Sequence, residues 1–96
     1  MKMVLIAYSE AADYDLIGAI KAAGVRGYTK FTEVLGEGTE TEPHMGTQCW
    51  PGRNNFLAIA VEDKEVEHLI SAVKEMKKKH PKAGVKAFIM PMEGIV

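Results

Sequence analysis

Three side chains that can bind soft metal ions lie close together in one segment of the chain. His44, Met45 and Cys49 fall within six residues of one another, and a mixture of imidazole and sulfur ligands suits Cu(I) or Zn(II). Two or three ligands do not complete a coordination shell, so Glu residues or neighbouring subunits would have to supply the others. The alternative is that His44 and Cys49 are ordinary loop residues.

A second group of side chains is basic and gathers near the end of a predicted helix. Positive charge is favoured there by the helix dipole, so the simplest interpretation is a solvated helix end. The alternative is an anion or phosphate site that extends to Lys86. The lysines of this basic cluster are Lys74, Lys77, Lys78, Lys79 and Lys82.

The sequence contains no recognisable set of catalytic side chains. It has no phosphate loop of the GxxxxGK type, no paired-histidine helix motif and no nucleophile elbow. His68 and His80 are not placed with a nucleophile and a carboxylate in a pattern that nucleophilic catalysis requires. We therefore predict that the protein is not an enzyme.

Length and charge limit the classes of protein to which the chain can belong. Its 96 residues suffice for a single domain, 1–96, and 12 basic against 13 acidic residues give a formal net charge of −1. This balance argues against nucleic acid as a partner. The longest apolar run, residues 3–7, is too short for membrane insertion, and the lone Cys49 cannot form an internal disulfide. We expect a cytoplasmic location.

Four segments have the composition of β-strands. Residues 1–8 and 56–61 are apolar at both odd and even positions, which is typical of central strands covered on both faces. Residues 28–35 and 85–90 suit the edges of a sheet. Residues 36–55 are rich in glycine and proline and follow neither periodicity, so they predict one long mobile loop.

Two segments have helical signals. The first helix is expected to begin at Tyr14 after a cap at Asp13 and to end at Gly24. The second is expected to follow a cap at Asp63 and to end at His80. Its apolar residues recur at spacings of three and four and are Val66, Leu69, Ile70, Val73 and Met76.

The order of these elements is the βαββαβ pattern of a ferredoxin-like α+β fold. Crossover handedness places both helices on the same face of a four-stranded antiparallel sheet. The other face has no helix to cover it, yet the first and third strands are apolar on both sides. Because a monomer would then expose a contiguous apolar patch, we expect this face to be buried against other copies of the chain.

Four segments, in register over nearly the whole chain, also carry a family resemblance. They resemble segments of the P-II signalling family, which belongs to a wider group of trimeric ferredoxin-like proteins that includes the CutA-like proteins. The segments are residues 23–29 after the first helix, 32–38 before the loop, 60–66 after the third strand and 86–93 in the last strand.

The resemblance implies a non-catalytic signalling protein, with nitrogen regulation as the default role, that assembles as a homotrimer. Each cleft between neighbouring subunits would bind a small effector such as ATP, ADP or AMP, and no cofactor would be required. The long loop would report this binding to a partner protein, either a transporter or an enzyme. The loop residues expected to contact the partner are Glu40, Glu42, Trp50 and Arg53.

The resemblance also implies which residues contact the effector. Lys86 corresponds to the family's phosphate-contacting lysine, and Gly36 and Gly38 at the loop base would let backbone amides approach a phosphate. Glu62 and Asp63 match positions near the adenine end of the ligand. Thr29 matches a further ligand position.

Several departures from the family pattern identify a divergent member. The loop, residues 36–55, has no tyrosine to accept a nucleotidyl group, and Thr39 and Glu40 replace the usual arginine and glutamine. The glycine-rich turn before Lys86 retains a single glycine, Gly84. The alternative function is that of a CutA-like trimer that binds divalent or copper ions.

Overall fold

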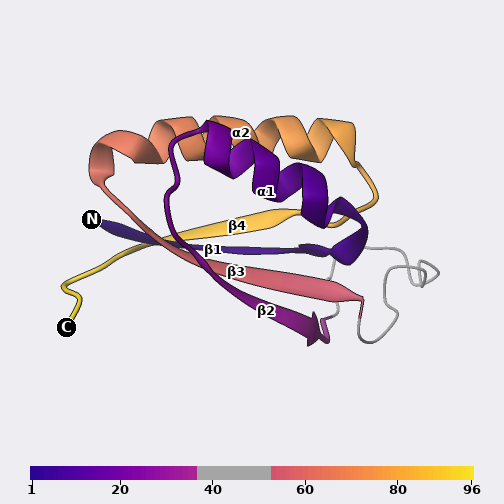
Figure 1. The fold of residues 1–96 in the computed structure, drawn as a ribbon, viewed down its shortest axis with the longest axis horizontal. Helices are drawn as coiled ribbons and strands as arrows, with labels where there is room; N and C mark the ends of the chain where they lie inside the picture. Colours follow the sequence, from indigo (N-terminus) through magenta and orange to yellow (C-terminus); the bar gives the residue numbers. More distant parts are fainter. Residues whose placement is uncertain (37–52) are drawn as a thin grey trace.

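The elements of the structure follow the predicted order. The computed structural model describes residues 1–36 and 53–96, and Figure 1 shows a sheet with helices on one side of it. The strands in this part of the chain are β1 (Lys2–Ser9), β2 (Thr29–Val34), β3 (Asn54–Val61) and β4 (Lys86–Pro91). The helices are α1 (Asp13–Ala22) and α2 (Val66–Lys79), which follow the short 3₁₀ turns η1 (Glu10–Ala12) and η3 (Asp63–Glu65).

β1 and β3 form the centre of the sheet, and β2 and β4 form its edges, as predicted. The strand order is β2-β3-β1-β4 and every neighbouring pair is antiparallel. Both helices cover the same face (Figure 1), which confirms the ferredoxin-like α+β fold. The loop is predicted to extend to residue 55, but Asn54 and Asn55 already belong to β3, where they pair with Ser9 and Tyr8.

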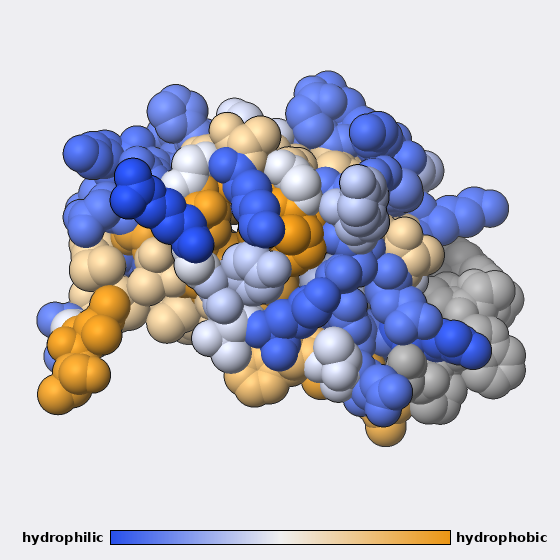
Figure 2. All heavy atoms as spheres, in the orientation of Figure 1, coloured by the Kyte–Doolittle hydropathy of each residue, from blue (hydrophilic) through white to orange (hydrophobic). Residues whose placement is uncertain are grey.

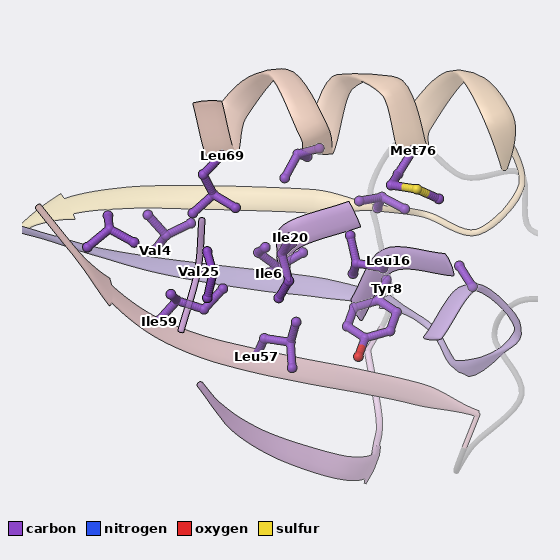
Figure 3. Packing of buried hydrophobic residues seen from close by; sticks show 14 residues of the cluster. Val4, Ile6, Tyr8, Leu16, Ile20, Val25, Leu57, Ile59, Leu69 and Met76 are labelled. Carbon is purple, nitrogen blue, oxygen red and sulfur yellow. The ribbon is translucent and has the colours of Figure 1, made fainter. Parts of the chain in front are cut away.

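The hydrophobic core lies between the sheet and the two helices. Alternate residues of the central strands point into it, and Val4, Ile6, Leu57 and Ile59 are between 0% and 1% exposed. The predicted apolar stripe of α2 supplies buried side chains from the other side of this core. Figure 3 shows the strand residues packed against side chains of the helices, among them Leu16, Ile20, Leu69 and Met76.

The helix ends differ in part from the prediction. Gly24 follows α1 with φ +104°, a left-handed conformation that glycine adopts without a steric penalty, so the predicted end is confirmed. Both predicted caps are wrong. Asp13 is the first residue of α1 and Asp63 the first residue of η3, and no side chain caps either helix. Both carboxylates are engaged by other donors, described below.

The sheet face opposite the helices, called here the open face, is apolar. Residues that alternate with the buried ones in β1 point toward it, and the strand register places apolar partners beside them. Phe31, Phe88 and Met90 are 50%, 49% and 38% exposed. Among the described residues, the apolar members of the open face are Met3, Leu5, Ala7, Phe31, Phe56, Ala58, Ala60, Phe88 and Met90.

Asp13 binds three strands of the sheet to the start of α1. Its Oδ1 accepts hydrogen bonds from the Tyr8 hydroxyl at 2.6 Å and from Asn55 Nδ2 at 3.1 Å. Its Oδ2 accepts one from Lys30 Nζ at 3.0 Å. Burial alone would raise the pKa of Asp13, but the hydrogen bonds from Tyr8, Lys30 and Asn55 outweigh it and hold the pKa below its usual value. Burial, together with this carboxylate, raises the pKa of Tyr8.

No helix in the described part of the chain is long and apolar enough to cross a membrane.

We predict that Asp13→Ala lowers the free energy of unfolding by about 3 kcal/mol, because it leaves the hydroxyl of Tyr8 and the amide of Asn55, two buried residues, without an acceptor. Urea denaturation at neutral pH measures this change. Glu10→Ala is the matched control, since it removes a carboxylate from an exposed ion pair, and its effect should stay below about 1 kcal/mol. Equal losses in the two variants would contradict the role given to Asp13.

The lowered pKa of Asp13 also predicts a pH dependence. A carboxylate whose pKa is depressed in the folded state stabilises the protein above its unfolded pKa of about 3.9, and this contribution disappears as the pH falls through the folded value. Asp13→Asn should therefore lose less stability than the parent protein on acidification below about pH 4. Urea denaturation at several pH values tests this, and parallel pH profiles for the two proteins would contradict it.

Candidate functional site

Lys86 begins β4 at the end of the sheet where the turn from α2 arrives. It is exposed, pairs with Ala7 and shares the side of the sheet that forms the open face. The preceding residue, Val85, is buried. Its carbonyl accepts a hydrogen bond from Lys77 Nζ at 2.9 Å, so one lysine of the basic cluster supports the segment that carries Lys86.

The turn before Lys86 is joined to the end of β1. The Ser9 amide donates to the Ala83 carbonyl at 2.8 Å, and Gly84 has φ +65°. A residue with a Cβ would be strained in that conformation. The expected glycine-rich turn keeps only Gly84, and this is the position at which the backbone conformation requires a glycine.

The two stems of the predicted loop meet at this same end of the sheet. Gly36 lies two residues beyond β2, and Arg53 comes directly before β3. The Glu10 amide donates to the Arg53 carbonyl at 2.6 Å, and Arg53 Nη1 lies 3.1 Å from Glu10 Oε2. The guanidinium predicted to contact a partner thus pairs with a carboxylate of η1, although 65% of its side chain stays exposed.

The stem on the β2 side leaves the regular strand geometry before the loop starts. Pairing with β3 shifts register between Phe31 and Val34, and Glu33 has φ +57°. For a residue other than glycine this conformation costs roughly 1 kcal/mol. Such irregularities bend a strand and change the direction of the side chains that follow.

Glu62 and Asp63 lie at the opposite end of the sheet. They follow Val61, which pairs with Lys2. Asp63 Oδ1 lies 3.0 Å from the amino terminus of Met1, and this hydrogen bond and its positive charge lower the pKa of Asp63. The Glu62 side chain is exposed.

One copy of the chain does not bring all the predicted effector residues together. Gly36 and Lys86 are at one end of the sheet, while Thr29 pairs with Ala58 in its middle. Because Lys86 pairs with Ala7 whereas Val61 before Glu62 pairs with Lys2, the two ends are separated by about 16 Å along β1.

The other predicted loop residues lie outside the described residues. They are Gly38, Glu40, Glu42, His44, Cys49 and Trp50. The predicted metal ligands are among them. Within residues 1–36 and 53–96, no three His, Cys, Asp or Glu side chains are grouped so that they could hold a metal ion.

Sequence reasoning missed Asp13 as the residue that holds these elements in place. A single carboxylate contacts Tyr8 beside the end of β1, Lys30 in β2 and Asn55 at the start of β3. The last two strands carry the stems of the loop. The alternating pattern of β1 and β3 places Tyr8 and Asn55 on the helix side, but nothing in the sequence identifies the carboxylate that they share.

Comparison with solved structures gives the same fold. CPII from Thiomonas intermedia, in a structure with ADP and bicarbonate, superposes with a TM-score of 0.70 at 20% identity, over 92% of this chain and 81% of that chain. A CPII structure with ADP, AMP and bicarbonate gives 0.70 at 18% identity, over 98% and 94%. A PII-like signaling protein from Thermus thermophilus gives 0.65 at 24% identity, over 92% and 81%.

The comparison with curated proteins finds no match. The family model described as nitrogen regulatory protein P-II, however, matches residues 1–96. This match spans both sheet edges, both helices and the residues between the loop stems. The chain therefore belongs to the nitrogen regulatory protein P-II family.

Proposed function

We propose that the protein is a non-catalytic cytoplasmic regulator that binds an adenine nucleotide and acts on a transporter or an enzyme through residues 36–55. Support comes first from the family match over the whole chain. It comes second from the CPII structures, whose bound molecules include ADP and AMP. The residue that carries the proposal is Lys86, an exposed cation at the end of the sheet from which both loop stems emerge.

The phosphate groups would bind at the end of the sheet that carries Lys86. An ammonium group stabilises a phosphate by charge. Gly36 follows the opposite edge strand of the sheet, so its backbone amides would add hydrogen-bond donors from a neighbouring copy of the chain. A ligand held there lies at the end of the sheet from which both stems of the loop emerge. Its binding can therefore change the conformations that the loop adopts and the partner that recognises it.

The adenine end requires a second copy of the chain. Glu62 and Asp63 are about 16 Å along the sheet from the phosphate end, and in one copy they sit at the far end of β3. We propose that they reach the nucleotide bound by a neighbouring subunit. The expected site is thus complete only in the oligomer.

The open face is the surface through which the subunits would associate. Its apolar side chains come from all four described strands, and burial of apolar surface contributes about 25 cal/mol per Å². We propose a homotrimer in which the three open faces pack together. The alternative of a CutA-like metal-binding trimer depends on His44 and Cys49, which lie outside the described residues.

We predict that Lys86→Ala weakens the binding of ADP about tenfold or more, because it removes the cation that faces the phosphates. Isothermal calorimetry with ADP, AMP and ATP measures the affinities. Lys78→Ala is the matched control, since Lys78 is an exposed lysine of the basic cluster. This variant should bind ADP with the affinity of the parent protein. If Lys78→Ala has the larger effect, the phosphates bind at the helix end instead.

We predict that Phe88→Glu converts the trimer into monomers at micromolar concentration, because a carboxylate would have to be buried on the open face. Light scattering measures the mass. Tyr14→Glu is the matched control, since it places the same charge at an exposed aromatic residue of α1, and it should leave the trimer intact. A parent protein that scatters as a monomer would contradict the proposed assembly.

A further inference from the structure

A hollow of about 390 Å³ lies between α1 and the start of β2, on the helix side of the sheet. This volume is within the range of roughly 300 to 1,000 Å³ that is usual for small-molecule sites. Figure 2 shows the corresponding face, where hydrophobic surface is recessed between hydrophilic side chains. The residues that line the hollow are Asp13, Tyr14, Asp15, Ile17, Gly18, Lys21, Tyr28 and Lys30.

The two carboxylates of the hollow are already engaged within the protein. Asp13 accepts hydrogen bonds from Tyr8, Asn55 and Lys30. Asp15 Oδ2 lies 2.9 Å from His80 Nε2 at the end of α2. Both oxygens of Asp13 are therefore occupied, and Asp15 has one described partner.

The donors of the hollow are less fully used. Lys21 makes no hydrogen bond or ion pair with any other described residue. Lys30 contacts one carboxylate oxygen, and an ammonium group has three N–H donors. Because Lys21 has no partner among the described residues and Lys30 keeps two N–H donors beside its bond to Asp13, the hollow offers unused ammonium donors to a negatively charged group.

The lining of the hollow includes a glycine that the fold itself does not require. Gly18 is in the middle of α1, where glycine costs about 1 kcal/mol relative to alanine. A Cβ built on Gly18 would meet no atom within 4 Å, and its φ is not in the left-handed region. The open space above the helix backbone is therefore available to a molecule from outside the chain.

The other lining residues favour a flat apolar ligand beside Gly18. Tyr14, Ile17, Gly18 and Lys21 have the i, i+3, i+4, i+7 spacing that places them along one face of α1. Tyr28, which directly precedes β2, also lines the hollow. Aromatic side chains form stacked or edge-to-face contacts with planar rings.

We propose that this hollow binds a small organic anion with a planar ring, such as an aryl carboxylate. The ring lies over Gly18 and Ile17, and the carboxylate is held by Lys21 and Lys30. The site is separate from the one proposed at Lys86, which is on the open face side of β4. It does not depend on nucleotide binding or on the proposed partner.

Titration of the full chain with benzoate tests the proposal, with NMR shifts of backbone amides and tyrosine rings as the readout. Benzoate at millimolar concentration should shift the signals of Tyr14, Gly18 and Tyr28. Lys21→Ala should weaken binding about tenfold, whereas Lys74→Ala, a matched exposed lysine on α2, should not. Benzylamine has the same ring with the opposite charge and should bind more weakly than benzoate.

Gly18→Leu tests the shape of the site. Leucine favours a helix more than glycine does and its side chain has open space, so the melting temperature should not fall while benzoate binding is lost. If this variant retains its affinity for ADP, the hollow and the nucleotide site at Lys86 are separate. Absence of benzoate shifts in the parent protein, equal binding of benzylamine, or unchanged binding by Gly18→Leu would each overturn the proposal.

Discussion

The structure depends on one constraint: two helices cover one face of the sheet, and the central strands are apolar on both faces. Val4, Ile6, Leu57 and Ile59 are almost completely buried beneath the helices. The residues that alternate with them, such as Leu5 and Ala58, belong to the open face. Since water contact with so much apolar surface is unfavourable, the open face accounts for the proposed association of subunits. The proposed nucleotide site depends on this association, because its residues lie at opposite ends of the sheet within one subunit.

The end of the sheet near Lys86 is held together by contacts that converge on a few residues. Ser9 binds the turn before β4, Glu10 binds Arg53 through both backbone and side chain, and Asp13 reaches β2 and β3. Both loop stems are thereby tied to the rigid sheet, while Glu33 on the β2 side has a strained conformation. Lys30 takes part in the Asp13 contacts and also lines the hollow beside α1. A ligand in that hollow would therefore contact the same side chain that fixes β2.

Much of the fold could be predicted because it follows from local periodicity. The stripe of α2, the continuous apolar run of β3 and the end of α1 at Gly24 are each encoded within a few neighbouring residues. The caps were predicted wrongly, because a carboxylate at a helix start has several possible donors. Asp13 bonds to Tyr8, Asn55 and Lys30, and Asp63 to the amino terminus. Those donors are distant along the chain or outside the helix, so no local signal reveals them.

The sequence by itself determined the kinds and order of elements, the apolar character of both sheet faces and the residues that match the P-II family pattern. These properties depend on side-chain type and spacing, which a chain carries before it folds. The tertiary structure alone decided which of the candidate residues are neighbours. It placed Gly36, Arg53 and Lys86 at one end of the sheet and Glu62 and Asp63 at the other. It also formed the hollow between α1 and β2, because strand register and helix packing, which set these distances, arise only when remote segments meet.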